Sequence, residues 1–377
     1  MKKRLGDYIQ EYSVRNKSGE DIPVYSITNS QGFCRDYFSK EVASKDKTSY
    51  KIVPRGCFAY NPSRINVGSV DWQRDEERVI VSPLYNVFSV SPEIDQQYLY
   101  YYLKSSATSY RIKEVATGSV RDNLRLSMLY DFMIELPSLD VQRQIVSNLD
   151  LLASIIRQRN QQLTKLDELI KARFVEMFGD MLLNSLEWPE KPLEGLADIV
   201  SGITKGRKTT ETGLIEVPYM AVSNVKSGYI DWTTIKTILA TKQEIEQYRL
   251  MPDDILMTEG GDPDKVGRGA IIKNPLENSI HQNHIFRVRL DKSELLPAYF
   301  AEYLQHQKAK RYFLGCAKQT TGIASINMRQ LRALPVLIPP LPLQNQFAAF
   351  VAEVDKSKLF AELFAQSTCI LAENRSK

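Results

Sequence analysis

Two stretches of the chain carry apolar residues at the three- and four-residue spacing of a long helix. The first runs from about residue 141 to Gly179, and only Arg159 and Arg173 interrupt its heptad seam. The second runs from about 343 to 373 and has a bulkier, more aromatic seam. Two helices with one apolar face each most simply pack on each other, so we expect an antiparallel coiled coil. The predicted helix-pair interface consists of Ile145, Leu149, Leu152, Ile156, Leu163, Leu166, Ile170, Phe347, Phe350 and Val354.

The long segments before each helix alternate short apolar runs with polar turns. Val87–Val90 and Ile285–Leu290 are typical of strands, whereas Tyr98–Lys104 and Pro297–Gln307 are typical of helices. The pattern therefore predicts an α+β protein with two similar β-rich domains joined by two long helices. The expected domain bounds are 1–138, 139–180 for the central helix, 181–338, and 339–377 for the C-terminal helix.

The two halves resemble each other in sequence. YKIVP at Tyr50–Pro54 matches YRLMP at Tyr248–Pro252, and VFSV at Val87–Val90 matches IFRV at Ile285–Val288. Each half also ends in a proline-containing exit that leads into its long helix through Leu-x-x-Gln. Since these matches keep their order at a nearly constant offset, we interpret the chain as a two-fold duplication.

Composition narrows the class of protein. The 377 residues carry a net charge of only +4, so no strongly basic tail is available for binding. The four cysteines lie far apart without a CxxC pair, which argues against a disulfide framework and favours a reducing cytosol. No run approaches the roughly 20 apolar residues that cross a bilayer, so we expect a cytoplasmic protein with no membrane partner.

Common catalytic motifs are missing from the sequence. There is no GxxxxGK[ST] phosphate loop, no Asn/Asp-Pro-Pro-aromatic methyltransferase motif and no Asp/Glu-x-Lys nuclease core. His281 and His284 form an HxxH pair without a third zinc ligand, so we expect them to be structural or exposed and expect no metal. No catalytic residue is predicted, and recognition is favoured over catalysis.

Polar loops in matching places of the two halves are candidates for contact with DNA. Arginine and asparagine can read base edges, and lysine can hold phosphate. The alternative interpretation of such loops is an ordinary solvated turn. The candidate DNA-binding residues are Arg55, Asn61, Arg64, Asn66, Arg121, Lys205, Arg207, Lys208, Lys265 and Arg268.

These features together resemble the DNA-specificity subunit of type I restriction–modification systems. The resemblance rests on LPSLDVQRQIVSNLD and IPPLPLQNQFAAFVAEVD at the helix starts, on KARFVEMFGD at Lys171–Asp180, and on YNPSRINVGSV and GGDPDKVGRGAI in the loops. It implies two target-recognition domains, each reading one part of a bipartite double-stranded DNA target. It implies helices that set the spacing between these parts and dock partner subunits.

The resemblance also implies which chemistry belongs to partners. Two methyltransferase subunits and restriction endonuclease–translocase subunits would carry S-adenosylmethionine, ATP and Mg²⁺, and this chain would hold no cofactor. Two other interpretations remain open on the residues alone. One is an enzyme acting on DNA with an unrecognised nuclease or methyltransferase site, and the other is a coiled-coil adaptor with no role on DNA.

Overall fold

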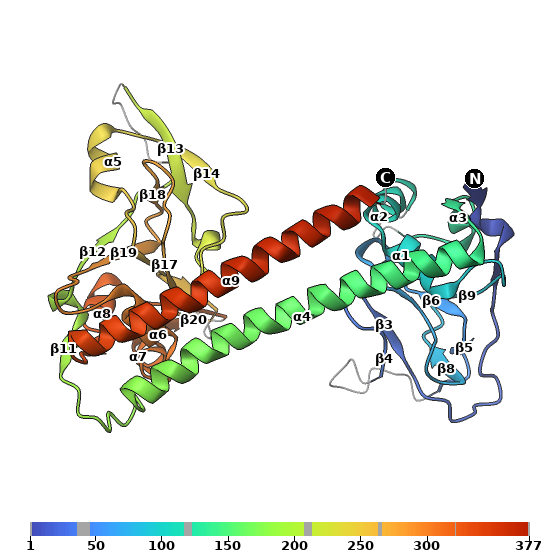
Figure 1. Cartoon of the computed structure of the whole chain (residues 1–377), viewed down its shortest axis with the longest axis horizontal. Helices are drawn as coiled ribbons and strands as arrows, with labels where there is room; N and C mark the ends of the chain where they lie inside the picture. Colours follow the sequence, from blue (N-terminus) through green and yellow to red (C-terminus); the bar gives the residue numbers. More distant parts are fainter. Residues whose placement is uncertain are drawn as a thin grey trace. The chain divides into compact units, whose positions relative to one another are not determined.

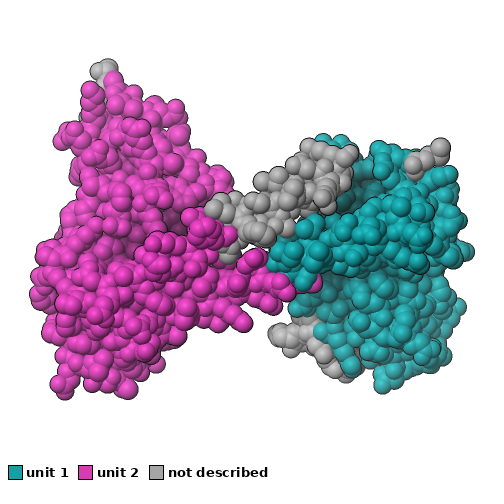
Figure 2. All heavy atoms as spheres, in the orientation of Figure 1, with its two compact units in different colours: residues 1–156, 372–377 teal, residues 157–371 magenta. Residues whose placement is uncertain are grey.

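In a computed structural model, the chain forms two compact units. Figure 2 colours the first unit, residues 1–156 with 372–377, and the second unit, residues 157–371. The structure describes residues 2–35, 46–116, 123–206, 213–262, 266–320 and 322–375, and their side chains except those of 319, 320, 323 and 361–375.

The first unit is built on a four-stranded antiparallel sheet with strand order β2-β9-β6-β7. Short pairs, β1-β10, β3-β4 and β5-β8, lie beside it, and α1 and α2 pack near β7 and the turn after β6. The strands are β1 (Lys2–Arg4), β2 (Ile9–Glu11), β3 (Ser26–Thr28), β4 (Gly32–Cys34), β5 (Lys51–Pro54), β6 (Phe58–Tyr60), β7 (Val70–Trp72), β8 (Arg78–Val81), β9 (Asn86–Val90) and β10 (Met133–Glu135). The helices are α1 (Gln96–Lys104), α2 (Ser106–Val115) and α3 (Leu126–Leu129).

The second unit repeats this plan. Its central sheet has the order β12-β19-β15-β17, and β11 pairs with β22 as β1 pairs with β10. It adds the sheets β14-β13-β18 and β16-β21-β20. The strands are β11 (Glu190–Pro192), β12 (Ala197–Ser201), β13 (Ile215–Met220), β14 (Lys236–Ala240), β15 (Ile255–Thr258), β16 (Gly260–Gly261), β17 (Gly269–Ile271), β18 (Ile280–His281), β19 (Ile285–Leu290), β20 (Lys318–Thr320), β21 (Ile323–Ser325) and β22 (Pro335–Leu337). The helices are α5 (Lys242–Tyr248), α6 (Pro297–Gln305), α7 (Gln307–Cys316) and α8 (Met328–Arg332).

Figure 1 follows this repeat along the chain, with the long helices α4 (Leu139–Phe178) in green and α9 (Leu341–Arg375) in red. Both helices were expected within two residues of these bounds. Gly179 ends α4 with φ 75°, a left-handed conformation that glycine adopts without steric cost. The α+β class and the duplication predicted from sequence are confirmed.

A buried glutamine fixes the start of each long helix. In the first unit the Gln142 amide nitrogen donates to the carbonyls of Glu93 and Pro137, both at 2.9 Å, and its oxygen accepts from the Asp95 amide at 2.9 Å. In the second unit Gln344 makes the same three bonds, and both glutamines are fully buried. The glutamine of each Leu-x-x-Gln exit therefore ties its helix to the loop that leads into α1 or α6.

Candidate nucleic-acid interface

The loop between β6 and β7 carries three of the predicted DNA-binding residues of the first half. Two hydrogen bonds join this loop to the segment that precedes α3. The Leu124 amide donates to the Pro62 carbonyl at 3.1 Å, and the Tyr60 hydroxyl donates to the Leu124 carbonyl at 3.0 Å. The β6–β7 loop and the segment before α3 are thus neighbours at one end of the sheet.

The structure gives the first-half candidates different surroundings. The Arg55 guanidinium donates to the carbonyls of Asp75 at 2.5 Å and Glu76 at 3.5 Å, and the Asn61 side-chain oxygen accepts from Ser63. The Arg55 side chain thus joins the β5–β6 loop to the β7–β8 loop, whereas Asn61 holds the β6–β7 loop to which it belongs.

Arg64 and Asn66 are less engaged. Arg64 is exposed, and its guanidinium has no ion pair or hydrogen bond with any residue that the structure describes. The Asn66 side-chain oxygen is buried and lacks a hydrogen-bond donor among those residues. Arg64 is consequently the first-half candidate most free to contact an external group.

Lys104 also shapes the β6–β7 loop, although sequence analysis did not select it. Its ammonium donates to the carbonyls of Gly68 at 2.7 Å and Asn29 at 2.9 Å. Burial lowers the pKa of Lys104, while the nearby Asp71 carboxylate raises it. Gly68 has φ 93°, so the loop depends on glycine there and on the lysine that holds its carbonyl. Only the fold shows that the last turn of α1 reaches this loop.

Three candidate loops converge in the second half. The Ile203 amide donates to the His281 carbonyl at 2.9 Å, and the Asn283 amide donates to the Ile203 carbonyl at 3.1 Å. Strand β16 pairs with β21, so Gly260 and Gly261 of the β15–β17 loop lie against the segment before α8. The Thr258 amide donates to the Arg268 carbonyl at 3.1 Å, which closes the β15–β17 loop.

Two second-half candidates have described surroundings. Lys205 is exposed without an ion pair to any described residue, and the Arg268 Nε atom is buried with no acceptor among them. Arg121, Arg207, Lys208 and Lys265 lie outside the described residues.

The two histidines of the HxxH pair have different surroundings. His281 is fully buried, its Nδ1 lies 3.1 Å from the Ile285 carbonyl oxygen, and burial lowers its pKa to about 4. The His284 Nδ1 lies 2.7 Å from a carboxylate oxygen of Glu259, and both side chains are partly exposed. Sequence analysis expected these histidines to be structural or exposed, and it missed Glu259 as the partner of His284. The cross-strand register that brings Glu259 to His284 was the missing information.

Within the second unit, the C-terminal half of α4 and the first turns of α9 run antiparallel. The Phe174 and Phe347 rings lie 5.5 Å apart, and further along the Lys358 ammonium lies 2.5 Å from the Asp167 carboxylate. The buried cluster there includes Ile170, Phe347 and Val354, with Leu166 and Phe350 packed against it.

The remaining seam positions are less buried. Leu163 is half-buried beside this cluster, and Ile145, Leu149, Leu152 and Ile156 are half-buried on α4 in the first unit. The pairing of that part of α4 with the end of α9 stays a prediction. Sequence analysis missed the rings of Phe174 and Phe178, which join the helices to Tyr299 of α6.

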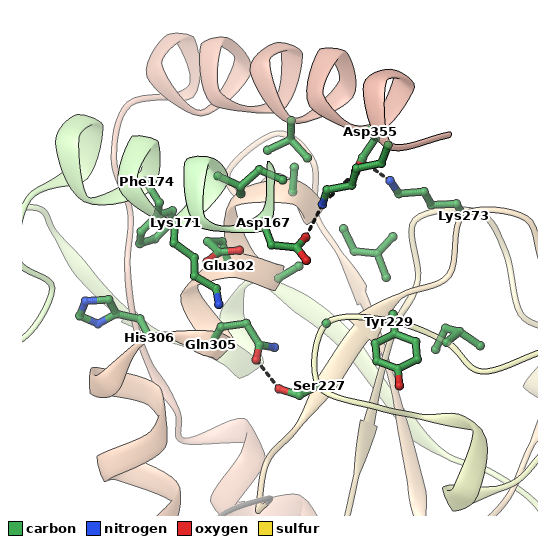
Figure 3. A pocket seen from close by; sticks show the side chains of 18 of the residues that line it. Asp167, Lys171, Phe174, Ser227, Tyr229, Lys273, Glu302, Gln305, His306 and Asp355 are labelled. Carbon is green, nitrogen blue, oxygen red and sulfur yellow. Dashed lines mark hydrogen bonds and ion pairs between the residues drawn. The ribbon is translucent and has the colours of Figure 1, made fainter. Parts of the chain in front are cut away.

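A cavity of about 1090 Å³ lies between these helices, α6 and the loop before β14. Figure 3 shows side chains from all of these elements around it, including Lys171, Tyr229, Glu302 and Gln305. Glu302 forms no hydrogen bond or ion pair with the described part of the chain, and burial raises its pKa. Tyr229 is 60% exposed and Trp232 is 38% exposed. The exposed aromatic rings of the cavity suit contact with protein, because tyrosine and tryptophan are enriched at protein interfaces.

The family model for the type I restriction modification DNA specificity domain matches residues 6–165 and again 185–363. A putative type I restriction enzyme MjaX specificity subunit of Methanocaldococcus jannaschii is 28% identical over 171 residues, covering 45% of this chain and 40% of the relative. The EcoKI specificity subunit of Escherichia coli is 22% identical over 270 residues, covering 68% of this chain and 58% of the relative. The chain therefore matches between two-fifths and three-fifths of the length of these relatives.

Solved structures agree with the fold. The S subunit of a type I restriction–modification system from M. genitalium superimposes with a TM-score of 0.54 at 14% identity, covering 99% of this chain and 94% of that chain. A chain from a study of complex assembly and conformational transition of a type I system gives 0.52 at 16% identity, with the same coverages. No described helix is both long and apolar enough to span a membrane. From the two family matches, which together cover most of the sequence, we conclude that the chain belongs to the type I restriction–modification DNA specificity family and contains its domain twice.

Proposed function

We propose that this chain is the DNA-recognition subunit of a type I restriction–modification complex. Each half would read one part of a bipartite double-stranded target. The observation that carries this proposal is the repeated sheet whose end gathers polar loops in both halves, with different side chains on the two copies. A duplicated scaffold with diverged loops is what recognition of two different half-sites requires.

We further propose that the chain is not an enzyme and works in the cytoplasm. Methyl transfer, ATP hydrolysis and cleavage would belong to two methyltransferase subunits and to restriction endonuclease–translocase subunits. Those partners would hold S-adenosylmethionine, ATP and Mg²⁺. The exposed faces of α4 and α9, together with the cavity beside them, offer a docking surface with charged and aromatic side chains.

The test uses the chain co-purified with its methyltransferase partner, followed by sequencing of methylated DNA. The Arg64→Ala variant should weaken recognition of one half-site, and Lys205→Ala or Arg268→Ala should weaken recognition of the other. Loss of a bidentate base contact costs about 1–3 kcal/mol at one position, whereas loss of a phosphate contact weakens all sequences alike.

Arg78→Ala is the matched control, because Arg78 is already paired with Glu20 at 2.6 Å. It should leave both half-sites unchanged. The proposal fails if the purified chain alone transfers methyl groups or cleaves DNA. The assignment of one half-site to each half fails if variants in both halves disturb the same half-site.

A further inference from the structure

The same cross-strand position is occupied by different pairs in the two halves. Phe58 lies opposite Phe88 in the first sheet, and Met257 lies opposite Phe286 in the second. Two residues further along β6, Tyr60 lies opposite Asn86. The corresponding position of the second sheet pairs Glu259 with His284, since the Glu259 amide donates to the His284 carbonyl at 3.0 Å.

The two pairs differ in what surrounds them. Tyr60 is fully buried, and its hydroxyl is used within the fold on the Leu124 carbonyl. The Glu259 and His284 side chains are 34% and 56% exposed, and they lie 2.7 Å apart at Oε2 and Nδ1. A structural pair in the first half is thus replaced by a solvent-facing pair in the second.

The Glu259–His284 pair lies where the second-half loops meet. The Glu259 carbonyl accepts from the Ile326 amide at 2.8 Å, which anchors it to the segment before α8. On the other side, Asn283 is bonded to Ile203, two residues before the exposed Lys205. The pair is therefore central to the surface through which the second half would contact DNA.

A carboxylate in that position needs a physical reason, because it repels the phosphates of DNA. One compensating interaction is acceptance of the N4 amino hydrogen of cytosine in the major groove, which carboxylates favour. The imidazole of His284 holds one oxygen of Glu259, and the structure shows no bond from the other oxygen to a described residue. The pair thus presents a carboxylate acceptor that is oriented by the adjacent imidazole.

We propose that Glu259 reads a cytosine in the second half-site and that His284 positions the carboxylate for this contact. The proposal rests on the proposed function, and it names one base and the residue that reads it. It assigns no reading role to the equivalent pair of the first half, because Tyr60 is buried there.

The experiment compares methylation patterns of complexes containing Glu259→Gln with those of the natural chain. A glutamine amide both donates and accepts, and it pairs best with adenine. We therefore expect the preference at one position of the second half-site to move from cytosine towards adenine. Methylation of the original site should fall on the order of 10- to 100-fold. The first half-site should keep its sequence.

Glu277→Gln is the control, since it removes the same charge from an exposed residue in the β17–β18 loop of the same unit. It should leave base preference unchanged. His284→Phe should reduce discrimination at the same position as Glu259→Gln, with unchanged recovery of the complex, because a merely structural role would lower recovery without moving the base preference.

The outcomes separate the two proposals. If the natural complex methylates no bipartite sequence, the proposed function fails. If it does so, and Glu259→Gln complexes of normal recovery keep every base preference, the function stands and the reading role of Glu259 is overturned. A change confined to the first half-site overturns it as well.

Discussion

The two halves of this protein share a scaffold and differ at the end of their central sheets. In each half, two tyrosines of one helix donate hydroxyl hydrogens to carbonyls of the last strand. The bonds are Tyr98 to Glu135 at 2.7 Å and Tyr102 to Met133 at 3.3 Å, repeated as Tyr299 to Leu337 at 2.9 Å and Tyr303 to Pro335 at 2.6 Å.

The difference between the halves concerns burial and charge. The first sheet ends in a buried tyrosine, whereas the second ends in an exposed glutamate–histidine pair. All three histidines of the chain also lie in the second half. Positions that hold the scaffold have thus stayed alike after duplication, while positions open to an external partner have diverged. Three sets of substitutions test which positions hold the shared scaffold and which distinguish the two halves.

The largest effect on stability is expected at the starts of the two long helices, where the halves make the same hydrogen bonds. Replacing Gln142 by leucine removes the three hydrogen bonds that its buried amide makes with part-buried backbone groups, at nearly constant side-chain volume. We expect the free energy of unfolding to fall by about 3 kcal/mol, since each buried group left unsatisfied costs roughly 1–3 kcal/mol and relaxation recovers part of it. Gln344→Leu should cost a similar amount, as measured by urea unfolding of the full chain.

Neighbouring glutamines on the same helices provide controls. Gln144 and Gln346 are exposed, so their leucine variants should change stability by less than about 0.5 kcal/mol. If the Gln142 and Gln344 variants lose very different amounts of unfolding free energy, the two helix starts are not equivalent. The two halves then differ in their scaffold as well as in their loops.

Acid should distinguish the halves through His281. The pKa of its buried imidazole is about 4, compared with 6.5 for an ordinary histidine, so the unfolded chain takes up the proton first as pH falls. The stability contributed by the neutral ring is complete above pH 6.5 and is lost progressively towards pH 4. The loss amounts to about 3 kcal/mol.

Hydrogen exchange of β18 and β19 as a function of pH measures this loss in the second unit. His281→Gln should flatten the dependence between pH 6.5 and 4, even if the variant is less stable overall. His284→Gln is the control for removing a histidine and should keep the slope. An unchanged slope in His281→Gln would show that other groups cause the acid sensitivity.

The smallest effect concerns one hydrogen bond in two environments. Tyr299→Phe leaves the Leu337 carbonyl buried without its donor and should cost about 1–2 kcal/mol. Tyr98→Phe should cost less, because the bond to Glu135 is exposed and water can replace the hydroxyl. Thermal unfolding of the two variants tests this order, and a larger loss for Tyr98→Phe would contradict it.

Much of the fold followed from the order of residues along the chain. Heptad spacing predicted the bounds of α4 and α9 to within two residues, because the apolar residues of an amphipathic helix recur at the helical period along the sequence. The ordered matches between halves predicted the duplication, and strands such as β9 and β19 were recognisable as short apolar runs. The sequence could not show which polar side chains already form hydrogen bonds within the fold. Arg55 proved to be bonded to the β7–β8 loop, and Asn61 to Ser63 of its own loop.

The sequence by itself thus determined the repeat, the long helices and the family, since these depend on local periodicity and on ordered motifs. Only the tertiary structure decided that three distant loops meet at one end of a sheet and that Glu259 faces His284. It also decided that His281 is buried while His284, three residues later, is exposed. The physical reason is strand register: hydrogen bonds between segments far apart in sequence choose which side chains meet, and no local pattern records that choice.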